Sequence, residues 1–382
     1  MEFQNLKALF VKLNEIGLKN QKRDDLSGIL IFQPLFDASG KLDRAKLGEI
    51  DKEGEVYSEM LTRYLFLMSV LDQGPDMEGV RIFLERIVNS LYSKGIKFLH
   101  CPSIFFKNLE DVFNVVNAEH KKIKEERGEM WAKTQNSKRA KSYNLFLENS
   151  KQISSYVMGR FGPPLSIIEI LKEKNTRLLD HFKKRKSAEA LSKYIKEDEF
   201  FGLGKAIGNK AAHLLIKWLI YTYGILDLDT KGWGQNSYEL PLDSNAGRVL
   251  FMAGFFDYFL PGIDNPEKFI GFKNEKGDNY YIYVTRAFRG KRAENLDMDE
   301  TEKIREIMHK LFSSNIRTVQ VQWLVNYISE VTGSSVGAID DGLMKIGTTY
   351  CINRGNQVCN KCEISELCKS YDDKYRKNHF HT

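Results

Sequence analysis

The sequence predicts a mainly α-helical fold, and three observations support this prediction. Apolar residues recur with the 3.6-residue period of a helix, and the run after Gly208 is a clear example. Its apolar face holds Ala211, Leu214, Leu215, Trp218 and Leu219. The N-terminal stretch MEFQNLKALFVKLNEIG has the pattern of an amphipathic helix. Period-two alternation, typical of a β-hairpin, is found at residues 268–288 and predicts one small hairpin inserted among helices.

Composition bounds the class of protein. The chain has 382 residues, 42% of them hydrophobic and 28% charged, which is typical of globular proteins with room for two or three compact units. No apolar run reaches the ~18 residues of a membrane span. The net charge of +6 is compatible with a polyanionic partner. We therefore expect a cytoplasmic protein, associated with the nucleoid if the source is prokaryotic.

A glycine-punctuated turn precedes the helical run that begins near Asn209. Gly202, Gly204 and Gly208 allow backbone conformations and close approaches that other residues resist. The free N–H groups at the start of the following helix form a candidate phosphate site. Lys210 lies in the first turn of that helix, away from its apolar face. Taken by themselves, these residues favour a surface lysine after an ordinary turn over a catalytic one.

An aspartate precedes the next helical run. Asp243 follows Pro241 and is followed by the apolar stretch Val249–Phe259. Aspartate before a helix is most often an N-cap, and the helix dipole favours its anionic form. The cap and a chemical role for the carboxylate do not exclude each other.

Four of the five cysteines lie close together near the C-terminus. Cys351, Cys359, Cys362 and Cys368 have the spacing C-x7-C-x2-C-x5-C, with no histidine among them. Such clustering indicates a metal site in a reducing compartment rather than disulfides. Four thiolates hold either a structural Zn²⁺ or a [4Fe–4S] cluster. Zinc ribbons usually present two C-x2-C pairs, and only one is found here.

The segments GNKAAHLL and LPLDSNAGRV resemble the helix-hairpin-helix and the Pro/Asp loop of the endonuclease III superfamily of DNA glycosylases. Gly208, Lys210 and Ala212 match the family turn G-x-G-x-K-x-A, whereas Ala206 replaces its first glycine. A register shifted by four residues would place Ala206 at the lysine position. The second segment matches the V/P-D-T-H-x-x-R-V element at Asp243, Ser244, Asn245, Arg248 and Val249, with Ser for Thr and Asn for His.

The resemblance assigns roles to these residues. It implies that Lys210 is the Schiff-base lysine and Asp243 the catalytic aspartate, and that the residues contacting DNA are Gln73, Gly204, Gly208, Asn209 and Arg248. Gln73 and Asp76 match a further family element that resembles LLSAQTTD, whose glutamine fills the gap left by a flipped nucleotide. The cysteine spacing resembles the family's iron–sulfur loop, in which the first gap is commonly one residue shorter. It implies a [4Fe–4S] cluster, with zinc as the alternative.

The resemblance also implies an organisation and an activity. We expect N-terminal helices at 1–62 that pack with a C-terminal unit at 301–382, whose iron–sulfur loop spans 351–368. A barrel-like helical domain at 63–262 holds the helix-hairpin-helix at about 200–223, and the β-hairpin insertion occupies 263–300. The two helical subdomains would flank a DNA-binding cleft. The expected activity is that of a monomeric DNA N-glycosylase with associated AP-lyase activity, acting on double-stranded DNA without an obligate protein partner.

Three alternatives remain open on the sequence. The chain could keep the fold and bind DNA without cleaving it, it could hydrolyse free nucleosides or nucleotides, or it could be a zinc-bound interaction protein. Residues 118–152 are basic and contain Trp131 and Tyr143, a pattern compatible either with contact to a phosphate backbone or with a solvated surface. The loop at 226–239 is longer than the family's spacing requires. The sequence does not identify the base that would be excised.

Overall fold

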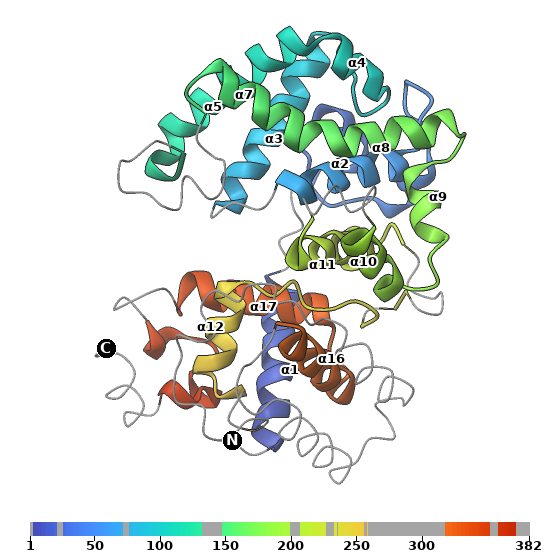
Figure 1. Ribbon diagram of the computed structural model, residues 1–382. Helices are drawn as coiled ribbons and strands as arrows, with labels where there is room; N and C mark the ends of the chain where they lie inside the picture. The colour runs from blue at the N-terminus through green and yellow to red at the C-terminus, as the bar shows by residue number, and fades with distance from the viewer. Residues whose placement is uncertain are drawn as a thin grey trace. The chain divides into compact units, whose positions relative to one another are not determined.

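The computed structural model describes most of the helical part of the chain (Figure 1). The residues that it describes are 3–20, 26–71, 76–131, 147–198, 207–226, 233–234, 236–255, 258, 318–351 and 358–371. The sequence predictions that lie outside these ranges concern Gln73, Tyr143, Gly202, Gly204, Ala206 and the β-hairpin at 268–288.

The described residues confirm the mainly α prediction. They contain no β-strand, only two isolated bridges, Phe36–Leu42 and Ile50–Val56. None of the helices in these ranges combines the length and apolar content needed to cross a bilayer.

The chain divides into two compact units at positions that differ from the predicted boundaries. Unit 1 combines Met1–Lys22 with Gly234–Thr382, and unit 2 is the continuous segment Arg23–Trp233. The predicted boundaries at residues 62 and 262 both fall inside these units. The N-terminal helix alone belongs with the C-terminal part of the chain, because residues 26–62 pack within unit 2.

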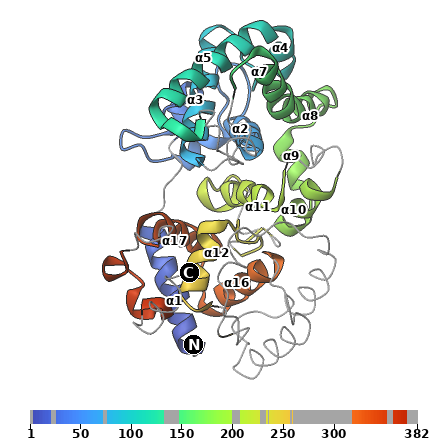
Figure 2. The ribbon, with the colours of Figure 1, turned by 60° about the vertical axis from the view of Figure 1, so that its left-hand side comes forward.

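Unit 2 is a bundle of helices (Figure 2). They are α2 (Tyr57–Leu71), α3 (Met77–Ser93), α4 (Pro102–Lys107), α5 (Leu109–Arg127), α7 (Ser150–Tyr156), α8 (Gly162–Glu173), α9 (Leu178–Lys183), α10 (Ala188–Glu197) and α11 (Asn209–Lys217). Helix α2 lies at the centre, because it contacts α3, α8, α9 and α11 and nearly all of its residues are buried.

A buried carboxylate fixes α9 to this central helix. Glu59 of α2 accepts hydrogen bonds from the main-chain N–H groups of Leu178 and Leu179, at 2.9 and 2.8 Å. It also accepts one from Arg63 Nε at 2.7 Å. The carboxylate therefore satisfies N–H groups at the start of α9 that have no partner within that helix.

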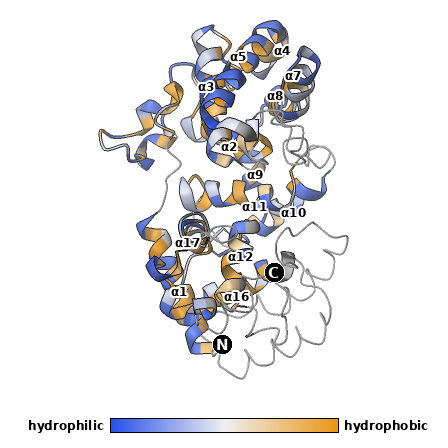
Figure 3. Ribbon diagram, turned by 90° about the vertical axis from the view of Figure 1, so that its left-hand side faces the viewer, coloured by the Kyte–Doolittle hydropathy of each residue, from blue (hydrophilic) through white to orange (hydrophobic). Residues whose placement is uncertain are grey.

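Unit 1 consists of α1 (Phe3–Lys19), α12 (Ser244–Met252), α16 (Thr318–Thr332) and α17 (Val336–Thr349), followed by the cysteine loop. Helix α1 is amphipathic, as predicted, and shows hydrophilic and hydrophobic stripes in Figure 3. Its packing against α17 is the most extensive contact between two helices among the described residues. The N-terminal helix is therefore part of the same core as the helix that leads into the cysteines.

Two glycines allow α1 and α17 to approach closely. A Cβ atom on Gly17 would lie 1.8 Å from the carbonyl oxygen of Ala338, and one on Gly342 would lie 2.2 Å from that of Leu13. Real Cβ atoms do not tolerate such distances, so each position requires glycine for this backbone contact. The Asn14 side chain adds a polar link by accepting a hydrogen bond from the Ser335 N–H at 3.0 Å.

Candidate active site and metal centre

Asp243 is the N-cap of α12. Its Oδ1 atom accepts hydrogen bonds from the N–H groups of Asn245 and Ala246, at 2.8 and 2.9 Å. The capping role expected from the sequence is therefore confirmed. The side chain is half-buried, and Oδ2 makes no hydrogen bond with the described residues. One carboxylate oxygen thus orients the group while the other remains available.

Long polar side chains of α16 hold the segment that leads to Asp243. Gln322 Nε2 donates to the Leu240 carbonyl oxygen at 2.5 Å, and Asn326 Nδ2 donates to that of Tyr238 at 2.7 Å. Both amide groups are buried. Part of the predicted loop at 226–239 is therefore fixed against α16, and its anchored end determines where Asp243 lies within unit 1.

Arg248 does not have the exposed position that a DNA contact needs. Its side chain is buried, and its guanidinium donates to the carbonyl oxygens of Cys351 and Gly347, at 2.7 and 2.9 Å. It also donates to Asn245 Oδ1 at 2.8 Å. We correct the sequence prediction accordingly: Arg248 joins α12 to the end of α17 and to the first cysteine.

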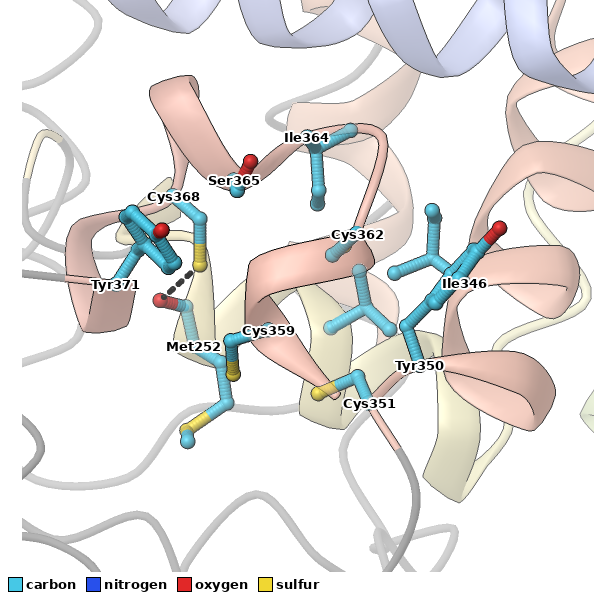
Figure 4. Close-up of a pocket in the computed structure, with 11 residues that line it drawn as sticks. Met252, Ile346, Tyr350, Cys351, Cys359, Cys362, Ile364, Ser365, Cys368 and Tyr371 are labelled. Atoms are coloured by element: carbon cyan, nitrogen blue, oxygen red, sulfur yellow. Dashed lines mark hydrogen bonds between the residues drawn. The ribbon is translucent and has the colours of Figure 1, made fainter. Parts of the chain in front are cut away.

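The four clustered cysteines line one pocket of unit 1 (Figure 4). The other lining residues are mostly apolar and come from α12, α17 and the cysteine loop: Val249, Met252, Ile346, Tyr350, Ile364, Ser365 and Tyr371. All four thiols are free of disulfide bonds. Cys368 Sγ lies 3.3 Å from the Met252 carbonyl oxygen, which places this thiol against the end of α12. The fold therefore places all four cysteines on the wall of one pocket, although Cys351 and Cys368 are 17 positions apart in the sequence.

Four thiols on one pocket lining are a donor set that thiolate-bound groups use, but their sulfurs are not gathered around one point. No three cysteine sulfurs among the described residues lie within 4.8 Å of one another. A single tetrahedral Zn²⁺ needs its thiolates about 4 Å apart, since Zn–S bonds are ~2.3 Å long. A [4Fe–4S] cluster binds each thiolate at a different iron atom and accommodates wider spacing. Burial raises the pKa of the Cys351 thiol to about 11 and raises that of Cys362 as well.

Lys210 lies in the first turn of α11, as the sequence predicted. The helix begins at Asn209, and Gly208 precedes it with φ −80° and ψ 179°. That conformation is open to any residue, so Gly208 is not required here for a positive φ. The lysine is half-buried, and its Nζ atom lies 3.5 Å from Met77 Sδ. It forms no ion pair with a described residue.

Met77 connects Lys210 to the segment that contains Gln73 and Asp76. Met77 is the first residue of α3, and Asp76 is its N-cap, accepting a hydrogen bond from the Gly79 N–H at 3.1 Å. The structure therefore brings the second half of that sequence element next to the candidate lysine. Both lie in unit 2.

Asp76 itself is a buried hydrogen-bond acceptor inside unit 2. It is buried and accepts hydrogen bonds from Arg127 at 2.5 and 2.8 Å and from Trp131 Nε1 at 2.9 Å. Burial would raise the pKa of Asp76, but these bonds and the one from Gly79 outweigh it and hold the pKa below its ordinary value. Trp131 is buried, so it does not supply the exposed aromatic ring considered for residues 118–152.

The structure separates the predicted site residues into two groups. Asp243, Arg248 and the four cysteines lie in unit 1, whereas Lys210 and Gly208 lie in unit 2. Asn209 begins α11, and only its backbone is described. The contacts described above for each group are therefore contacts within one unit.

Several residues that shape these sites carried no signal in the sequence. Met77, Gly347 and Arg127 act through partners that lie between 51 and 133 positions away. A Cβ on Gly347 would lie 3.0 Å from Asn245 Cβ, so this glycine leaves room for the start of α12. Its place one turn before the first cysteine was visible in the sequence, but its packing partner was not.

Comparison with protein-family models, with curated proteins and with solved structures found no match to this chain.

Proposed function

We propose that this protein is a DNA N-glycosylase that extrudes and excises a base from duplex DNA, with associated lyase chemistry through Lys210. One observation carries the proposal: Asp243 and the cysteine pocket belong to one packed structure, joined by Arg248 through α12. Asp243 and Cys351 are 108 positions apart in the sequence, and Arg248 links the helix that follows Asp243 to the main-chain carbonyl of Cys351.

Asp243 has the geometry needed to stabilise a cationic sugar. Cleavage of an N-glycosidic bond builds positive charge on the deoxyribose, and a fixed carboxylate lowers the energy of that state. The two N–H donors of Asn245 and Ala246 hold Oδ1 in place. The other oxygen of this half-buried side chain, Oδ2, would face the sugar or orient a nucleophile.

Lys210 supplies the amine for the lyase step. Nζ would attack C1′ and displace the base. The C1′–O4′ bond of the sugar ring would then break, with O4′ taking up a proton, to give the Schiff base that permits β-elimination. The amine lies against a thioether rather than a carboxylate, so no described counter-ion occupies it. The N–H groups at the start of α11 are available for a phosphate of the same strand.

The four cysteines would hold a [4Fe–4S] cluster, because all four line one pocket and a cluster binds each thiolate at a different iron atom. When bound, this group supplies a structural cross-link. The protein residues around it would then fix the end of α17 and, through Arg248, the start of α12.

The decisive experiment uses the full-length protein and a panel of duplexes that carry damaged, mispaired or modified bases. Abasic sites are scored with and without strand nicking. We expect Asp243→Asn to lower base release by about 10²- to 10³-fold while duplex binding is retained, because asparagine keeps the N-cap but not the charge. We expect Lys210→Gln to lose borohydride trapping to DNA.

Three outcomes would count against the proposal. Absence of base release from every duplex would exclude a glycosylase and leave a DNA-binding protein. Full trapping by Lys210→Gln would show that another amine forms the Schiff base. Activity on free nucleosides that does not change with salt would indicate a small-molecule hydrolase, because duplex binding depends on salt.

A further inference from the structure

Four consecutive cationic residues run from the last residue of α9 into its connection with α10. They are Lys183, Lys184, Arg185 and Lys186, and the three lysines are exposed. The turn is ordered by main-chain hydrogen bonds from Lys184 to Asp180 and from Arg185 to Phe182, at 3.2 and 3.0 Å. Ser187 then caps α10 by accepting from the Ala190 N–H at 3.1 Å. The four charges are therefore presented on a defined backbone. We call them the α9–α10 basic turn.

The arginine of this turn is fixed by an aromatic ring. The Arg185 guanidinium carbon lies 3.6 Å from the centroid of the Tyr194 ring. His181 completes the group, with its Nε2 atom 3.3 Å from Tyr194 Oη and 3.4 Å from Arg185 Nη2. Burial and then the nearby charges of Arg185 and Lys184 lower the pKa of His181, which agrees with a positive potential at the turn.

The lysines of the basic turn have no counter-ions among the described residues. Some other cations of unit 2 do pair with acids, as exposed Lys94 does with Asp111 at 2.7 Å and half-buried Arg86 with Glu126 at 2.9 Å. No such pair is formed by Lys183, Lys184 or Lys186. Other exposed lysines of the described ranges are also unpaired, but they are scattered, whereas the charges of the basic turn are consecutive. Three uncompensated charges next to a stacked arginine form a surface suited to a polyanion.

We propose that the α9–α10 basic turn binds the phosphate backbone of duplex DNA through Lys183, Lys184 and Lys186. This inference extends the proposed function and rests on it for the identity of the polyanion. Helix α10, which follows the turn, packs on α11, the helix that carries Lys210 in its first turn. Contacts of this kind add affinity without reading sequence.

The surroundings favour nucleic acid over an anionic membrane. Peripheral membrane helices insert an apolar face into the lipid. The apolar residues of α10, Ala188, Leu191 and Ile195, are buried, and none of the exposed large hydrophobic residues in the described ranges lies between 178 and 198. The basic turn therefore offers charge without an apolar anchor.

The test is the salt dependence of binding to an undamaged duplex. The variant Lys183→Gln/Lys184→Gln/Lys186→Gln is compared with a matched control, Lys41→Gln/Lys52→Gln/Lys107→Gln, which removes the same charge from exposed positions of unit 2. Each lost phosphate contact reduces the slope of log K against log salt by about 0.9. We expect the first variant to lose about two to three units of slope and to bind on the order of tenfold more weakly. The control should behave as the wild type.

The outcomes separate this inference from the proposed function. Equal losses of affinity and slope in the two variants would show that only net charge matters, which would overturn the inference. An unchanged slope in the first variant would overturn it as well. Binding to phosphatidylserine vesicles that depends on these lysines, with duplex binding unchanged, would assign the turn to membranes instead. If the wild-type protein binds duplexes through the turn but releases no base, the DNA-binding role of the turn stands and the glycosylase proposal is wrong.

Discussion

The Nε atom of Arg248 donates a 2.7 Å hydrogen bond to the main-chain carbonyl oxygen of Cys351, which lies 103 residues further along the chain. Its Nη2 atom bonds to Gly347, so one buried guanidinium satisfies two carbonyl groups near the end of α17. The helix that begins after Asp243 is thereby fixed to the pocket lined by cysteines. Within unit 1, the candidate catalytic carboxylate and the cysteine pocket are therefore linked through the same side chain.

Replacement of Arg248 should weaken unit 1. Arg248→Met removes three hydrogen bonds and leaves buried carbonyl oxygens without donors, so we expect a loss of about 2–4 kcal/mol in the free energy of unfolding. Arg248→Lys should recover only part of it, because an ammonium does not reproduce the planar fork. Urea denaturation measures both. Wild-type stability in Arg248→Met would show that these bonds are not important.

Contact between α1 and α17 should tolerate no side chain at Gly342. Gly342→Ala places a Cβ atom 2.2 Å from the Leu13 carbonyl oxygen, which forces the two helices apart. We expect a loss of about 1–3 kcal/mol or more and a lower melting temperature. Gly159→Ala is the control, because nothing lies within 4 Å of a Cβ there. Equal melting temperatures for the two variants would contradict this packing.

Stability at acidic pH should depend on Asp76. Its pKa is lowered in the folded protein, so its contribution is present above the ordinary pKa of about 4 and is lost as pH falls through the folded value. We expect Asp76→Asn to be destabilised at pH 7 by about 2–3 kcal/mol, since it breaks the bond pair with Arg127. The difference from wild type should shrink below pH 4. A constant difference from pH 7 to pH 3 would assign the stabilisation to another group.

The metal content of the purified protein should depend on the pocket cysteines. We expect about four iron atoms and four sulfides per chain by chemical assay, corresponding to one [4Fe–4S] cluster. Cys351→Ser should lose most of the iron and lower the melting temperature, because the cluster ties the loop to α17. Cys101→Ser is the control, since its thiol lies in unit 2 beside Ser103. About one zinc per chain and no sulfide would establish the zinc alternative.

Local features were predictable from the sequence because they depend on neighbouring residues. The 3.6-residue period located α1 and α11, and an aspartate before an apolar run predicted the N-cap at Asp243. The spacing of the cysteines predicted that they share one site, and they line one pocket. Each of these follows from helix geometry or from a short loop that limits how far its ends can separate.

Only the tertiary structure decided which distant residues meet. Nothing near Arg248 in the sequence indicates that its partner is the carbonyl of Cys351, and a basic residue after a candidate catalytic motif was therefore assigned to DNA. The same limit explains why all the N-terminal helices up to residue 62 are expected to pack with the C-terminal unit, although only α1 of that range belongs to unit 1. Helical periodicity predicts which face of a helix is buried, but it does not predict the helix on which that face packs. For α1 the partner is a helix hundreds of residues away whose shape is complementary, because Gly17 and Gly342 let the two backbones approach closely.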